Sequence, residues 1–197
     1  MTRRNVLMMG GAAIAALGLG IIFHTNPRLI WNASASVPVG LYRLESAPHL
    51  VRGDLVAAHT PDRFAPLFAA RHYLPSGVPL LKYVAALPGQ RVCRHNENIT
   101  LDGKRVATAR HFDRKGRALP AWQGCIRLTS EQVFLLNAAV RDSLDGRYFG
   151  VVPRQSILGH AVPFWTPSTH SLVPNVHQSR APPLAIQPPN HRQGETQ

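Results

Sequence analysis

Between residues 30 and 165 the hydrophobic positions occur in short runs separated by polar residues, glycine and proline, a pattern typical of β-strands. One helix is predicted from Asp62, a candidate N-cap, to His72. A hairpin turn is expected at Asp102-Gly103, because glycine readily adopts a positive φ. The pattern predicts a mainly β fold with long connections. The expected strands cover residues 54–59, 79–86, 91–94, 99–101, 132–136 and 157–164.

The chain begins with an uncharged hydrophobic run, Val6–Phe23, preceded by two arginines. As a helix, this run would extend about 27 Å, close to the ~30 Å thickness of the hydrocarbon layer. Because arginine-rich flanks stay in the cytoplasm, the rest of the chain is predicted to lie outside the inner membrane. A cleaved signal peptide is the alternative, with Ala33-Ser34-Ala35 as its small-x-small site, and residues 2–7 loosely resemble a twin-arginine signal. All these interpretations require export, and we favour an uncleaved anchor in residues 1–27.

The other end of the chain, residues 166–197, contains six prolines and little hydrophobic periodicity. Such a segment buries too little apolar surface to offset the entropy of ordering it, so a disordered tail is predicted. The folded domain is then expected in residues 28–165, a length that suits one hydrophobic core.

Composition and charge limit the classes of function. With 45% hydrophobic and 16% charged residues, the 197-residue chain is not wholly disordered. Lys and Arg number 22 against 10 Asp and Glu, a net charge of +12, and eight of the 22 lie between Arg91 and Arg117. Nucleic-acid binding and attraction to anionic lipid headgroups are two interpretations of this basic segment. We favour a third, a solvated basic surface, and expect no direct nucleic-acid binding because no motif for it accompanies the charge.

The chain has two cysteines, Cys93 and Cys125, which lie on the exported side in this topology. An oxidising compartment favours a disulfide, which would close a loop of about 33 residues and stabilise the fold by ~3–4 kcal/mol on the chain-entropy model. Two buried thiols are the alternative, and a catalytic cysteine is disfavoured because neither lies in a recognisable Cys–His setting. The sequence has neither a metal-ligand cluster nor a phosphate-binding glycine loop, so no metal or cofactor is expected.

Ser36 and Lys82 are the candidate catalytic residues. Ser36 lies in Ser34-Ala35-Ser36-Val37-Pro38-Val39-Gly40, where a turn into a strand can project its hydroxyl, although a polar turn has the same pattern. Lys82 lies inside the apolar segment 79–86, and most such lysines place the ammonium in water. If it is buried instead, desolvation lowers its pKa and the neutral amine becomes a usable base. A neutral lysine beside a serine hydroxyl is a nucleophile–base pair that needs no histidine.

A third motif, residues 142–150 (DSLDGRYFG), completes a pattern that resembles the Ser/Lys peptidases of the signal peptidase I superfamily, and in particular the TraF-type conjugal-transfer peptidases. The resemblance covers roughly residues 30–165. Gly146 departs from the pattern, because relatives usually carry a serine at this position. Val37-Pro38, directly after Ser36, matches the conjugation branch rather than the general leader peptidases. The matching motifs are Ser34-x-Ser36-x-Pro38-x-Gly40-x-Tyr42, Lys82 followed by Pro88-Gly89, and Ser143-x-Asp145-x-Arg147-Tyr148-Phe149-Gly150.

The resemblance implies a role for each matching side chain. In these roles Ser36 is the nucleophile, Lys82 the general base, Ser34 a hydroxyl donor that joins the Ser36 amide in the oxyanion hole, Ser143 the hydroxyl that orients the lysine amine, and Asp145 with Arg147 a structural ion pair.

The resemblance also implies a signal-peptidase-like β fold in the periplasm, anchored to the inner membrane. The expected activity is that of a serine endopeptidase that matures a pilin-like precursor for conjugal plasmid transfer and pilus assembly, by cleavage or by head-to-tail cyclisation. Expected partners are the precursor, the inner membrane and other conjugation or secretion components. One alternative is a non-catalytic periplasmic assembly factor, in which Lys82 would be exposed. Others are a general type I signal peptidase, and a peptidase freed by cleavage after Ala35 that uses the α-amine of Ser36.

Overall fold

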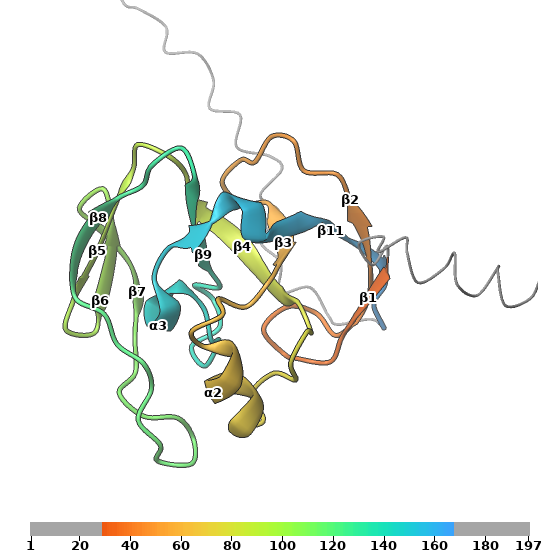
Figure 1. Ribbon diagram of the computed structural model, residues 1–197, viewed down its shortest axis with the longest axis horizontal. Helices are drawn as coiled ribbons and strands as arrows, with labels where there is room; N and C mark the ends of the chain where they lie inside the picture. The colour runs from red at the N-terminus through yellow and green to blue at the C-terminus, as the bar shows by residue number, and fades with distance from the viewer. Residues whose placement is uncertain (1–28, 168–197) are drawn as a thin grey trace, which may run out of the picture.

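The computed structural model describes residues 29–167, which form two antiparallel β-sheets (Figure 1). The larger sheet has the strand order β1-β2-β11-β3-β4-β9-β10, and the smaller has the order β7-β6-β5-β8. Figure 1 shows the smaller sheet at one end of the larger. The strands are β1 (Leu29–Asn32), β2 (Gly40–Glu45), β3 (Leu55–Ala58), β4 (Leu80–Ala86), β5 (Arg91–His95), β6 (Asn98–Leu101), β7 (Lys104–Thr108), β8 (Gly124–Arg127), β9 (Gln132–Leu136), β10 (Val152–Pro153) and β11 (Ile157–Trp165).

The described helices are short. They are α2 (Ala65–Ala70), α3 (Gly146–Phe149) and the 3-10 turn η1 (Arg154–Ser156). The mainly β prediction is confirmed, and no helix within residues 29–167 is long and hydrophobic enough to cross a membrane. The anchor expected in residues 1–27 lies outside the described residues, as does the expected tail apart from its first two residues.

All six predicted strands are present, with bounds that shift by at most a residue or two. The turn at Asp102-Gly103 joins β6 to β7, and both of its residues have positive φ (49° and 84°). The six ranges leave out β1, β2, β7, β8 and β10. Of these, β2 and β7 were implied by the expected turn into a strand after Ser36 and by the expected hairpin, whereas β1, β8 and β10 were missed. Cys93 and Cys125 lie opposite each other on β5 and β8 and form the expected disulfide.

The predicted helix was too long at both ends. It begins after Phe64, with no side-chain cap, so Asp62 is not the N-cap. Pro66 lies in its first turn, where a residue without an N–H is tolerated. It ends before His72, whose φ of 56° is incompatible with a helix.

The buried hydrophobic side chains form three clusters. One lies under β3, β4 and β9 and includes Val56, Val84 and Leu135. A second contains β4 and β9 residues together with Val92 and Ile99 of the smaller sheet, so it joins the two sheets. The third lies on the opposite face and includes Tyr42, Leu81 and Ala161.

Candidate active site

Lys82 lies in the middle of β4, on a face that is otherwise hydrophobic. It pairs across the ladder with Val56, and its neighbours on the same face, Leu80 and Val84, belong to the first hydrophobic cluster. The side chain is therefore buried, with only 4% of the residue exposed. Desolvation lowers the pKa of the Lys82 ammonium to about 8, partly opposed by the charge of Asp145 and reinforced by that of Arg147.

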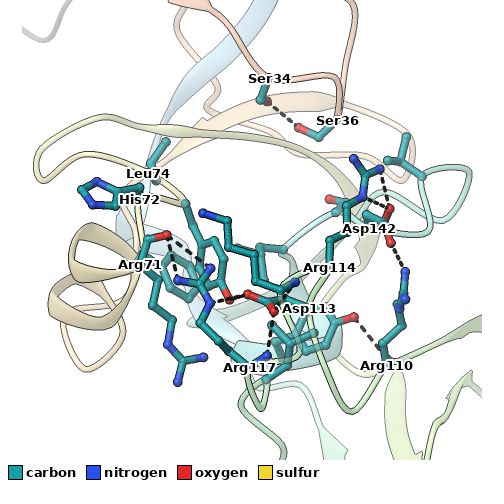
Figure 2. A pocket seen from close by; sticks show the side chains of 18 of the residues that line it. Ser34, Ser36, Arg71, His72, Leu74, Arg110, Asp113, Arg114, Arg117 and Asp142 are labelled. Carbon is teal, nitrogen blue, oxygen red and sulfur yellow. Dashed lines mark hydrogen bonds and ion pairs between the residues drawn. The ribbon is translucent and has the colours of Figure 1, made fainter.

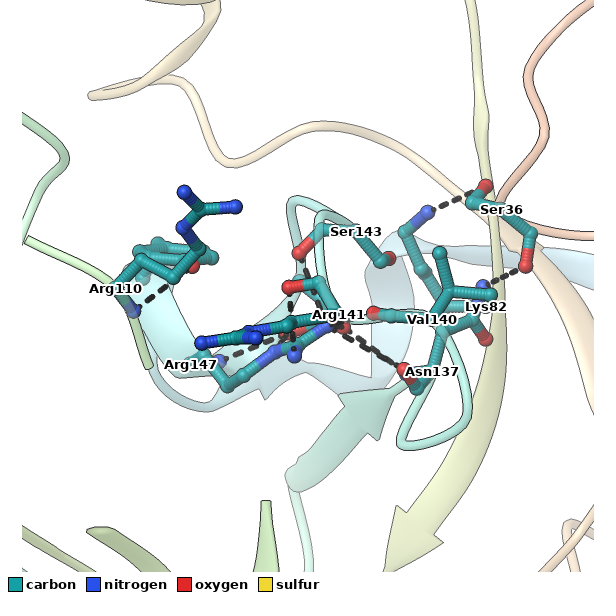
Figure 3. Close-up of polar contacts among 10 residues, drawn as sticks. Ser36, Lys82, Arg110, Asn137, Val140, Arg141, Ser143 and Arg147 are labelled. Carbon is teal, nitrogen blue, oxygen red and sulfur yellow. Dashed lines mark hydrogen bonds and ion pairs between the residues drawn. The ribbon is translucent and has the colours of Figure 1, made fainter. Parts of the chain in front are cut away.

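Ser36 lies in the loop between β1 and β2, and its Oγ accepts a hydrogen bond from Lys82 Nζ at 3.0 Å (Figure 3). Asn32, at the end of β1, holds this loop through its side-chain amide, which donates to the carbonyls of Ser34, Val37 and Pro38. The Tyr42 hydroxyl also donates to Pro38, at 2.6 Å. The serine is thus presented on constrained backbone, as the sequence interpretation required.

The loop closes onto β2 at a position that only glycine can occupy. Gly40 has a φ of 151°, and a Cβ there would lie 2.3 Å from the carbonyl oxygen of Trp165 on β11. The glycine of the sequence motif is explained by this close approach of two strands.

Ser34 lies next to the proposed nucleophile. Its Oγ is 2.9 Å from Ser36 Oγ, and it also donates to Asn32 Oδ1 at 2.9 Å. Because a hydroxyl has one proton, donation to an oxyanion would require Ser34 to turn away from Asn32. Its oxyanion-hole role stays a prediction.

Ser143 is buried, with 3% of the residue exposed, and it lines the same cleft as Lys82. Its Oγ has no hydrogen-bond partner among the described residues, so the expected bond to the lysine amine is not formed here. A role for Ser143 in orienting Lys82 stays a prediction.

Asp145 and Arg147 form the expected ion pair, in which Arg147 Nη2 lies 2.8 Å from Asp145 Oδ2, with 1% and 0% of the side chains exposed. Asp145 is also the N-cap of α3 and accepts from the Arg147 backbone N–H. The guanidinium donates to the backbone carbonyls of Asn137, Val140, Arg141 and Ser143, and so folds the loop that follows β9.

Gly146, the departure from the family motif, has a local explanation. A Cβ at this position would lie 2.4 Å from the ring of Phe134 and 2.7 Å from the carbonyl of Leu135. The Phe134 side chain therefore fills the space that a serine would need.

Sequence reasoning missed Asn137, which connects the ion pair to Ser36 (Figure 3). Its side-chain amide donates to the Ser36 carbonyl at 2.5 Å, and its backbone N–H donates to Asp145 Oδ2 at 3.0 Å. Asn137 is 2% exposed. A polar residue directly after the hydrophobic run of β9 was the available signal.

Ser36 and Lys82 open into a cleft of about 440 Å³, shown in Figure 2. Its walls come from the β1–β2 loop, the segment around α2, the long β7–β8 connection and the loop after β9. A buried amine, two adjacent hydroxyls and an open cleft together suit acyl transfer by a serine nucleophile.

Comparison with known proteins gives the class of this protein. The model of the family described as signal peptidase, peptidase S26, matches residues 2–165. The chain belongs to this family. Within it, the chain is similar to conjugal transfer proteins, as the motifs indicated: it is 34% identical over 176 residues to conjugal transfer protein TraF of Agrobacterium fabrum, covering 84% of this chain and 98% of the relative.

Two further relatives show both branches of the resemblance. The probable conjugal transfer protein TraF of Sinorhizobium fredii is 36% identical over 173 residues, which cover 81% of this chain and 89% of the relative. The probable signal peptidase I-1 of Synechocystis is 31% identical over 110 residues, which cover 56% of this chain and 52% of the relative.

Proposed function

We propose that this protein is a serine endopeptidase of conjugal transfer that matures a pilin-like precursor, with Ser36 as nucleophile and Lys82 as general base. The observation that carries the proposal is the 3.0 Å contact between Lys82 Nζ and Ser36 Oγ, made by an almost fully buried lysine. The match to TraF relatives over nearly their whole length supports the link to conjugation.

In the proposed mechanism, neutral Lys82 takes the proton of Ser36 as its Oγ attacks a peptide carbonyl. The Ser36 N–H and the Ser34 hydroxyl stabilise the oxyanion, where one lost donor typically costs ~3–4 kcal/mol. The Lys82 ammonium then gives its proton to the leaving amine, which departs and leaves an acyl-enzyme on Ser36. Attack by water completes cleavage, whereas attack by the terminal amine of the precursor closes a ring.

The non-catalytic assembly factor is the main alternative, and it requires an exposed Lys82 and an ordinary turn at Ser36. Burial of the lysine and the hydrogen bonds that fix the serine loop favour the peptidase. A lysine buried this deeply destabilises a fold, and a catalytic role gives a reason for retaining it.

We extend the proposal to a site of action on the outer face of the inner membrane. Trp31 and Trp165 stack with ring centroids 6.0 Å apart, and both are more than half exposed. Leu29 and Phe164 are exposed nearby on the same two strands. Tryptophans favour the membrane–water interface, so this patch suits contact with the bilayer that holds a membrane-inserted substrate.

The proposed function is tested by following the mass of the pilin-like precursor of the same conjugation system after incubation with the purified protein. Both reactions release a peptide from the precursor; hydrolysis adds one water to the remaining chain and cyclisation adds none, so the ring is lighter than the linear product by the mass of one water. A precursor peptide with an ester at the scissile bond, quenched in acid, should leave an acyl group on Ser36. An adduct on any other residue would contradict the assignment.

The pH dependence of the reaction follows from the pKa of Lys82. Since only the neutral amine accepts the serine proton, kcat/KM should rise with pH through about 8 and level off above it. The measurement is a pH–rate profile with a substrate that has no group titrating near pH 8. A profile that is flat or falling over this interval would contradict Lys82 as the base.

Asn137 is expected to act as a positioning residue. Asn137→Ala removes the bond to the Ser36 carbonyl and should lower kcat by roughly tenfold or more, because small displacements of a nucleophile are costly. KM should change little, and the pH–rate profile should keep its midpoint because Lys82 is untouched. Asn98→Ala, at an exposed position on β6, is the matched control. A tenfold rise in KM with unchanged kcat would show that Asn137 does not position Ser36.

A further inference from the structure

The basic segment noted in the sequence separates into two groups in the structure. Arg110, Arg114, Lys115 and Arg117 line the cleft that contains Ser36 and Lys82. Arg94 is instead buried between the smaller sheet and α3, where it donates to the carbonyl of Arg147. The remaining three, Arg91, Lys104 and Arg105, are exposed on strands of the smaller sheet and do not line the cleft. Half of the segment therefore faces the candidate active site.

We call the arginines and lysine at positions 71, 110, 114, 115 and 117, which line the cleft, the cationic wall. Contacts between the β7–β8 connection and the segment after α2 hold this wall in place (Figure 2). Tyr73 donates to Asp113 Oδ2, and Arg117 pairs with the same carboxylate at 2.7 Å while its guanidinium lies 4.9 Å from the Tyr73 ring centroid. Arg71, a fifth cation of the cleft, donates to the carbonyl of Ala118 at 2.6 Å. Side chains of the segment after α2 and of the β7–β8 connection thus contact each other and fix the position of the wall.

The wall has more positive than negative charge. Five cations, Arg71, Arg110, Arg114, Lys115 and Arg117, lie with two carboxylates, an excess of three. Hydrogen bonds from Arg114 and Arg110 lower the pKa of Asp142. Burial by itself would raise the pKa of Asp113, but hydrogen bonds from Tyr73 and Arg117 hold this pKa well below the usual range. Within residues 29–167, Arg71 and Lys115 form no ion pair with a carboxylate.

We propose that this wall binds carboxylates of the peptide substrate, so that the protein selects a polypeptide with an acidic segment close to the scissile bond. The inference rests on the proposed function, because it places the acidic segment beside the Ser36–Lys82 pair. Arginine binds carboxylates through paired N–H donors, and an excess of like charge in a cleft attracts and orients a ligand of the opposite charge. The carboxylate comes either from acidic side chains or from a C-terminus.

A peptide fits the cleft better than a nucleic acid or a lipid surface. The cations line a concave space together with hydrophobic side chains that include Phe68, Leu80 and Leu144. A phosphate backbone would leave those apolar contacts unused, and a flat bilayer would not enter the cleft. A peptide can place apolar and acidic side chains on the two kinds of wall at once.

The test uses the Ser36→Ala protein, so that binding is measured without turnover. The probes are eight-residue alanine peptides with two glutamates or two glutamines, each with a free or an amidated C-terminus and labelled with the uncharged dansyl group. In the Ser36→Ala background, Arg114→Gln with Lys115→Gln removes two cations of the wall. Lys104→Gln with Arg105→Gln is the matched control, because it removes the same charge from exposed positions on β7.

At low salt the wall variant should bind the glutamate peptide with a free C-terminus about tenfold more weakly than the control variant does. Added salt should reduce this difference. The glutamine peptide with an amidated end should bind all proteins equally. Weaker binding when glutamate is exchanged for glutamine would show that the wall binds acidic side chains. Weaker binding when the C-terminus is amidated would show that it binds a C-terminal carboxylate. Equal binding of the glutamate peptide to the wall and control variants would overturn the inference.

One further outcome separates this inference from the function on which it rests. Charge-dependent binding by a protein that never cleaves or cyclises the precursor would refute the peptidase and leave the acidic-peptide site standing. In the active protein the wall variant should raise KM for the precursor with kcat unchanged. Loss of binding to an oligonucleotide or to phosphatidylglycerol vesicles, with no effect on the peptides, would overturn the inference in favour of another anionic partner.

Discussion

Ser36→Ala and Lys82→Met are each expected to lower precursor processing by roughly 10⁴-fold or more. The two residues act as a unit, so removing either one leaves no activated nucleophile, and the remaining rate comes from binding and the oxyanion donors alone. The measurement is the mass of the precursor over time. Lys104→Met, at an exposed lysine on β7, is the matched control and should process normally. Normal processing by folded Ser36→Ala and Lys82→Met would eliminate the peptidase.

Loss of activity in Lys82→Met should be accompanied by a gain in stability. The pKa of Lys82 is about 8 in the folded protein against 10.5 for the free side chain, so the unfolded state binds the proton more tightly. The cost to folding is fully present below pH 8, at about 3 kcal/mol, and stability recovers as pH rises from 8 to 10.5. At pH 7 Lys82→Met should therefore unfold at higher urea than the parent, whereas at pH 10.5 the two should converge.

Breaking the Asp145–Arg147 pair should cost about 3–5 kcal/mol of unfolding free energy, because either single replacement leaves a buried charge without its partner. Arg147→Met also releases four backbone carbonyls of the loop after β9, so precursor processing should fall together with stability. Urea unfolding followed by circular dichroism gives the free energy.

The control for the buried pair is the exposed pair of Arg43 and Glu45, in which about half of each side chain is accessible. Arg43→Met removes the same kind of charge from β2 and should cost less than about 1 kcal/mol. Equal losses in Arg43→Met and Arg147→Met would show that burial does not govern the contribution of the inner pair.

The two residues that sequence reasoning missed at the site, Asn32 and Asn137, both act through hydrogen bonds to the backbone of the Ser34–Pro38 loop. An asparagine in a sequence is a common turn residue, and nothing local distinguishes one that holds a nucleophile. The strand β8 was missed for a similar reason, because its place is fixed by pairing with β5 rather than by a hydrophobic period of its own.

Hydrophobic alternation, turn residues and motif order determined the mainly β class, the six recognised strands and the residues proposed for catalysis, because each depends on neighbouring positions in the chain. The disulfide followed from the number of cysteines and the expected compartment. Whether Lys82 is buried depends on strands that lie beside β4 only after folding, and its contact with Ser36 spans 46 residues of sequence. The same holds for the cationic wall, which joins Arg71 to the β7–β8 connection. Burial and proximity are properties of the packed chain, and they decide which amine has a lowered pKa and which charges face the cleft.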